Sequence, residues 1–104
     1  MAYTAKVGDE VSIFISQADD GAAAYKNGKM FARADMRQST SGEFIMQSSP
    51  AHIRLEIWNV TGGWYGAKFA LYIGGKKVDT FVVNEGPDLP KSVAWDHEFT
   101  INPS

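Results

Sequence analysis

Residues 52–83 read HIRLEIWNVTGGWYGAKFALYIGGKKVDTFVV, and this stretch decides the fold. Apolar and polar residues alternate along three runs within it, which is the period-2 pattern of half-buried strands. Glycine pairs at 62–63 and 74–75 separate the runs, as expected of turns between strands. The three predicted strands cover residues 52–58, 67–73 and 78–82.

The apolar residues of these runs also predict a pairing, because cross-strand apolar pairs stabilise a sheet. Strands 52–60 and 66–74 are expected to form a hairpin around Gly63, with the pairs Ile57–Phe69, Leu55–Leu71 and Ile53–Ile73. The next turn is expected at Gly75-Lys76, with glycine first as a type II′ turn requires. A turn at this position predicts the cross-strand pairs Ile73–Val78, Leu71–Thr80 and Phe69–Val82.

Alternation then places aromatic and charged side chains together on the opposite face of this predicted three-stranded sheet. The residues of interest there are Arg54, Trp58, Tyr72 and Phe81. Such a face fits two interpretations. Another part of the chain or long charged side chains cover the rings, or the face binds a ligand or a second subunit.

The rest of the chain shows the same regular alternation of short predicted strands and glycine-containing turns. Residues 11–16, 44–46 and 93–101 are predicted strands, and 29–37 is interpreted as a strand rather than a helix. Residues 20–24 allow a single helical turn with Asp20 as its N-cap. The sequence therefore predicts one all-β domain over residues 1–104, a small antiparallel sandwich of about seven strands with jelly-roll or immunoglobulin-like topology.

Composition limits the possible partners. The 104 residues include no cysteine, which excludes disulfides and thiolate metal sites. Ten basic and twelve acidic residues give a net charge of −2, so no basic field attracts nucleic acid or anionic lipid. The longest apolar run, 69–73, is too short to span a bilayer. No secretory signal is visible, so synthesis in the cytoplasm is expected, with export by another route left open.

The loop between the first two predicted strands carries Trp64 and Tyr65 between glycines. Two large rings at a loop tip lose apolar burial unless something docks on them. Since pyranose rings present flat C–H faces, we expect Trp64 and Tyr65 to contact a sugar, with polar help from Asn59 and Thr61. The alternative is that Trp64 folds back against the end of the sandwich.

The sequence offers little for catalysis or metal binding. Asp96 and Glu98 share a strand face, but neither has an identifiable nucleophile beside it, and His97 is expected on the apolar side with Trp95 and Phe99. The acidic loop clusters at 19–20 and 84–88 do not match an EF-hand loop. We therefore expect no enzyme and no cofactor, with calcium unsupported.

The stretch from Leu55 to Ile73, in which Asn59-Val60 is followed by Gly62 to Gly66, is similar over this small part of the chain to small calcium-dependent bacterial galactose lectins. In that family a loop of the form Asp-Val-Pro-Gly-Thr-Tyr-Gly-Asn-Asn binds the metal and then the sugar. Here Asn59, Ala67 and Lys68 stand where acidic and amide ligands are needed. The metal ligands of that family are thus mostly missing, and the similarity implies sugar binding at most, with calcium possible but unsupported.

These observations lead to two hypotheses. The first is a carbohydrate-binding, lectin-like module that uses the aromatic loop, and the second is an interaction subunit that self-associates through the aromatic and charged face. Both are compatible with a homo-oligomer, since oligomers gain avidity for multivalent ligands.

Overall fold

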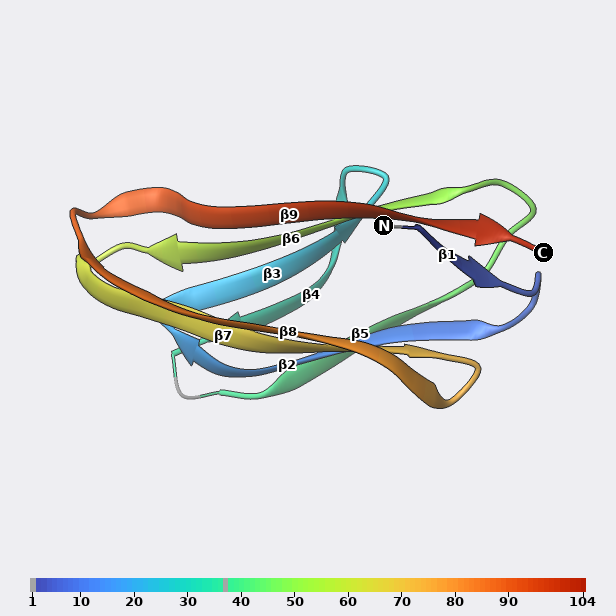
Figure 1. Cartoon of the computed structure of the whole chain (residues 1–104), viewed down its shortest axis with the longest axis horizontal. Helices are drawn as coiled ribbons and strands as arrows, with labels where there is room; N and C mark the ends of the chain where they lie inside the picture. Colours follow the sequence, from blue (N-terminus) through green and yellow to red (C-terminus); the bar gives the residue numbers. More distant parts are fainter. Residues whose placement is uncertain (1, 37) are drawn as a thin grey trace.

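Two β-sheets pack face to face in the computed structural model, which describes residues 2–36 and 38–104 and contains nine strands in those ranges (Figure 1). Sheet A consists, in spatial order, of β1 (Ala2–Ala5), β9 (Lys91–Pro103), β6 (Ala51–Asn59), β3 (Gly21–Lys26) and β4 (Lys29–Asp35). Sheet B consists of β5 (Thr40–Ile45), β2 (Glu10–Asp19), β7 (Gly63–Ile73) and β8 (Lys76–Asp88). Neighbouring strands are antiparallel except β1 and β9, which are parallel.

The predicted all-β sandwich is therefore confirmed, with two strands more than the approximately seven expected. The additional strands are β1 and β3. Nowhere in the two described ranges does the chain form a helix of the length and apolarity needed to cross a bilayer.

The core lies between the two sheets and is built by the alternating residues that the sequence singles out. Because successive side chains of a strand point to opposite faces, one apolar series from each strand is buried. Eight of these side chains are at most 1% exposed: Val11, Ile13 and Ile15 of β2, Ile53, Leu55 and Ile57 of β6, and Phe69 and Leu71 of β7.

The predicted hairpin between residues 52–60 and 66–74 is wrong, because β6 and β7 belong to different sheets. β6 pairs with β3 and β9, whereas β7 pairs with β2 and β8. The apolar residues expected to pair side by side instead belong to one core cluster formed by both sheets. Period-2 alternation identifies the buried face of a strand but not its neighbour, which is why both arrangements satisfy the same pattern.

The β7–β8 hairpin is confirmed, but its register differs from the prediction by two residues beside the turn and by one residue from Leu71 onwards. Ile73 pairs with Lys76, so the two turn residues are Gly74 and Gly75, with φ angles of 60° and 80°. Positive φ at both central positions is what a type I′ turn requires, and glycine adopts it without strain. The register then shifts by one residue, because Val78 is an extra residue of β8 between the pairs Tyr72–Lys77 and Leu71–Asp79. Phe81, rather than Val82, therefore lies opposite Phe69 and points inward.

The segment around residues 20–24 is a tight turn followed by β3 rather than a helical turn. Asp20 has a φ angle of 74°, and Gly21 begins the strand that pairs with β4 and β6. A side chain at Gly21 would meet the Trp58 ring, since a Cβ there would lie 2.4 Å from Trp58 Cε3. The strand expected over 29–37 is present as Lys29–Asp35, in which Ala32 and Ala34 are buried, and Arg37 lies outside the described residues.

One long side of the sandwich is closed by β4 and β5, and the other is closed by contacts between β8, β9 and β1. On the second side the Tyr3 hydroxyl donates a hydrogen bond to the Asp79 carboxylate. Phe81 of β8 stacks on Phe99 of β9, with ring centroids 5.6 Å apart. Sheet B ends at β8 and has no further strand opposite β1, so these two contacts join the sheets on this side.

The core assignment is testable with two leucines of contrasting burial. Leu71 is completely buried, whereas Leu89 is 75% exposed. We expect Leu71→Ala to lower the free energy of unfolding by about 2–5 kcal/mol, because it removes buried methyl groups and leaves a cavity. Leu89→Ala should change it by no more than about 0.5 kcal/mol. Urea denaturation measures both, and equal losses would contradict the described packing.

The Tyr3–Asp79 contact predicts a dependence of stability on pH. Burial, followed by the hydrogen bond to Asp79, raises the pKa of Tyr3 from 10.0 to about 12. The folded chain therefore retains a proton that the unfolded chain releases, so unfolding should become easier as the pH rises from about 10 to 12. Conversely, the Tyr3 hydrogen bond lowers the pKa of Asp79, so this contribution is present above the ordinary pKa of 3.8 and is lost as the pH falls through the lower folded value.

Tyr3→Phe should remove both contributions. Denaturation of the wild type and the variant across the acid and alkaline ranges measures this effect. Identical pH profiles for the two proteins would show that the contact contributes no pH dependence.

Candidate functional site

The outer face of sheet A carries a polar cluster built by three adjacent strands. Alternation along β6 points Arg54, Glu56 and Trp58 outward, as the sequence pattern predicts. The register then places Tyr25 of β3 on one side of Arg54 and Glu98 of β9 on the other. Residues from three parts of the chain are thus brought together on one surface.

Glu56 lies at the centre of this cluster and is only 5% exposed. Its Oε1 accepts hydrogen bonds from the Tyr25 hydroxyl at 2.7 Å and from Trp58 Nε1 at 2.9 Å. Its Oε2 forms an ion pair with Arg54 Nη2 at 3.1 Å. A buried carboxylate is costly unless it is paired and hydrogen-bonded, and here both oxygens have partners.

The surrounding side chains shield this carboxylate from water. The Arg33 guanidinium lies over the Trp58 ring, 4.9 Å from its centroid, and the same ring covers Gly21. Burial is the largest cause that raises the pKa of Tyr25 above its ordinary value, followed by its hydrogen bond to Glu56. Tyr25 therefore remains a hydrogen-bond donor throughout the physiological pH range.

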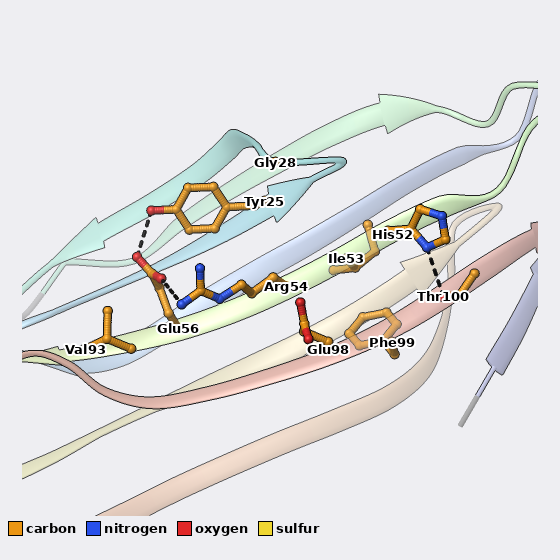
Figure 2. Close-up of a pocket in the computed structure, with 10 residues that line it drawn as sticks. All are labelled: Tyr25, Gly28, His52, Ile53, Arg54, Glu56, Val93, Glu98, Phe99 and Thr100. Atoms are coloured by element: carbon orange, nitrogen blue, oxygen red, sulfur yellow. Dashed lines mark hydrogen bonds and ion pairs between the residues drawn. The ribbon is translucent and has the colours of Figure 1, made fainter.

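A groove of about 780 Å³ runs along this face beside the cluster (Figure 2). Its polar lining includes Arg54, Glu56 and Glu98, together with His52 and Thr100 at one end. His52 Nδ1 lies 3.2 Å from Thr100 Oγ1, and the backbone N–H of His52 donates to Asn27 Oδ1 at 2.8 Å. These two interactions of His52 fix the position of this end of the groove.

The side chains that face the groove differ in how many interactions they make with the rest of the protein. Arg54 is held on two sides, since its Nε also lies 3.4 Å from Asp96 Oδ2. Glu98 is exposed and stands opposite Arg54 in the β6–β9 register. The groove therefore offers a guanidinium, an exposed carboxylate, a hydroxyl and an imidazole, which together donate and accept hydrogen bonds.

Val93 also lines the groove beside Glu56, although alternation along 93–101 groups it with the inward-facing Trp95 (Figure 2). The register of β6 and β9 shifts between Ile57 and Asn59, where β9 contains extra residues. β9 has two extra residues in this bulge, so alternation is interrupted at Val93 and resumes at Lys91, which pairs with Asn59. Sequence alternation alone does not reveal the bulge.

The four residues expected to contact a ligand at the aromatic loop do not share one surface. Trp64 is 58% exposed, as a contact residue must be, but Tyr65 is 8% exposed and belongs to the core. Asn59 is completely buried, and its Nδ2 donates to the Gly63 carbonyl at 3.2 Å. Thr61 is exposed, but its backbone N–H donates to Asp20 Oδ2 and its Oγ1 donates to Asp20 Oδ1, each at 3.0 Å.

The predicted aromatic and charged interface face is also not assembled. Arg54 and Trp58 lie on the outer face of sheet A, whereas Tyr72 belongs to sheet B. Phe81 points inward, where its ring centroid lies 5.2 Å from that of His97. The cause is the assignment of β6 to the other sheet together with the one-residue shift in the β7–β8 register.

The remaining candidate residues have structural partners. His97 pairs with the buried Leu55 on the inner face of β9, which confirms its expected position beside Trp95 and Phe99. Asp88 forms an ion pair with Lys91 at 3.0 Å. Over residues 2–36 and 38–104, no three His, Asp or Glu side chains are grouped so that they could hold a metal ion.

The fold and the groove thus define a small β-sandwich with a polar groove on one sheet. Comparisons of the chain with protein families, with curated proteins and with solved structures find no match.

The Glu56 cluster makes a specific prediction about stability. Glu56→Ala leaves the partly buried donors of Tyr25 and Trp58 without their acceptor and removes the ion-pair partner of Arg54, so we expect the free energy of unfolding to fall by about 3 kcal/mol. Asp96→Ala is the matched control, because Asp96 also pairs with Arg54 but its side chain is half exposed. It should cost less than about 1 kcal/mol. Comparable losses in urea denaturation would show that Glu56 is not the centre of the cluster.

Proposed function

We propose that this chain is a non-enzymatic carbohydrate-binding module that holds a sugar in the groove on sheet A. The observation that carries the proposal is the buried Glu56 carboxylate, which fixes Tyr25 and Arg54 beside the groove. Ligand sites are typically concave, with a few polar groups held in place among apolar ones. This groove has that composition on a rigid sheet.

Sugar hydroxyls both donate and accept hydrogen bonds, so they need both kinds of partner. Arg54 supplies donors, and the exposed carboxylate of Glu98, its neighbour on β9, supplies acceptors. Bonds to charged groups are stronger than those between neutral groups. The half-buried Tyr25 ring and Val93 add apolar surface for the C–H face of a sugar ring.

The groove supports this proposal better than the aromatic loop does. Only Trp64 of the loop offers an exposed ring, since Tyr65 is buried and Thr61 is engaged with Asp20. The groove instead combines hydrogen-bonding side chains from β6 and β9 with the Tyr25 ring of β3.

A glycan array, with and without calcium, tests the proposal, and titration calorimetry of the strongest glycan then locates the site. We expect Glu98→Ala to weaken binding by at least about tenfold, since it removes hydrogen bonds to a charged group. Glu43→Ala is the matched control, because Glu43 is an exposed glutamate on β5 outside the groove. This control should bind like the wild type.

Trp64→Ala distinguishes the groove from the loop. Because Trp64 is 58% exposed, the variant should fold normally, and a ligand in the groove should bind it unchanged. Loss of binding in Trp64→Ala but not in Glu98→Ala would overturn the groove as the site. The absence of any glycan ligand on the array would overturn the function.

A further inference from the structure

The strand β8 forms an uncovered edge of sheet B. β7 pairs with it on one side, and no strand of the described chain pairs with its other side. In Figure 1 the orange β8 runs beside the yellow β7 along the length of the molecule. An edge strand presents unpaired backbone N–H and C=O groups, which are a template for another strand.

The opposite edge of sheet B is much less accessible. There β5 lies close to β4, and a Cβ at Gly42 would lie only 1.9 Å from the Phe31 carbonyl oxygen. The rings of Phe31 and Phe44 also meet edge to face across this side, with centroids 5.3 Å apart. β8, with 13 residues, is therefore the long free edge of the sheet.

The sequence of β8 is suited to pairing with the β8 strand of a second copy of the chain. Lys76 and Lys77 lie at its start, and Glu85 and Asp88 lie towards its end. The residues between, 80–84, are uncharged and contain neither glycine nor proline. Val82 in this stretch is 67% exposed. β-branched and aromatic residues without charge favour strand pairing, whereas edges that avoid it carry charges or proline there.

We propose that two copies of this chain associate through antiparallel pairing of their β8 edges, with a two-fold axis near Phe81. Val78 is an extra residue of β8 in its ladder with β7, so Lys76 and Glu85, which pair with Ile73 and Tyr65, share one face of the sheet, whereas Lys77 lies on the other. Counted without Val78, Lys76 and Glu85 are equidistant from Phe81, so Lys76 of each copy lies opposite Glu85 of the other. Opposite charges at directly paired positions stabilise a ladder. The pairing extends sheet B across both copies.

The charges also select this register over its neighbour. A two-fold axis at Val82 instead places Asp79 opposite Glu85 of the second copy, and like charges in that position oppose pairing. With the axis at Phe81, Asp79 lies opposite Val83. The two Tyr3–Asp79 contacts then lie on opposite sides of the axis, so the β1 strands of the two copies do not meet there.

The edge also borders a hollow that a second copy would cover. This hollow has a volume of about 430 Å³ and is lined by residues 81–85 of β8 and by Trp95 of β9. Trp95 and Phe81 are only partly buried in the single chain. Covering their apolar surface adds a hydrophobic contribution to the backbone hydrogen bonds of the pairing. A net charge of −2 opposes association only weakly.

Sedimentation equilibrium up to submillimolar concentration tests the proposal with charge-reversal variants. We expect the wild type to dimerise, and Lys76→Glu and Glu85→Lys each to raise the dimer dissociation constant by about tenfold, since each creates two like-charge pairs. Lys29→Glu and Glu43→Lys are the matched controls, because they make the same charge changes on β4 and β5. These controls should dimerise like the wild type.

Two rescue experiments identify the pair. The double variant Lys76→Glu with Glu85→Lys restores opposite charges in both pairs, so it should dimerise like the wild type. Mixing the two single variants should produce heterodimers more strongly than either variant dimerises alone. A monomeric wild type at submillimolar concentration would overturn the proposal. So would a dimer that the single variants do not weaken or that neither rescue restores.

Discussion

The buried amide of Asn59 is the constraint on which the arrangement of the two sheets depends. Its Nδ2 donates to the Gly63 carbonyl at 3.2 Å and lies 3.5 Å from the Leu89 carbonyl. The first of these carbonyls belongs to the crossing from β6 to β7, and the second belongs to the crossing from β8 to β9. One side chain thus links two of the six passages of the chain between sheet A and sheet B, at the same end of the sandwich. These crossings place β9 beside β6, where the groove forms, and leave β8 at an edge.

The face of each strand was predictable from the sequence, but the neighbour of each strand was not. Leu55 and Leu71 are both buried, as alternation predicts, yet they lie on different sheets because the chain crosses at Asn59. In a sandwich, an apolar face is equally well satisfied by a neighbouring strand or by the opposing sheet. The sequence signal for the crossing is weak, since a buried asparagine looks like an ordinary turn residue.

The same reasoning explains what could be predicted of the site. Alternation correctly placed Arg54, Glu56 and Trp58 on one outer face, because that inference needs only one strand. It could not bring Tyr25 and Glu98 to them, since this requires the pairings of β6 with β3 and β9. Nor could it show that Glu56 is buried, because glutamate is usually exposed. The burial depends on Tyr25 and Trp58 from two neighbouring strands, and Trp58 has room only because Gly21 lacks a side chain.

The two proposed surfaces lie on different sheets, and this separation has a geometric consequence. Antiparallel pairing of the β8 edges uses a two-fold axis perpendicular to sheet B, which leaves each face of the sheet on the same side in both copies. Sheet A packs on one face of sheet B, so both copies carry it on that side. The outer face of sheet A, which bears the groove with Arg54 and Glu98, therefore points in the same direction in both copies. Two sites with a common orientation can engage neighbouring sugars on one surface, and the second contact then forms at a high effective concentration. Weak binding at each groove would be sufficient for a stable attachment of the pair.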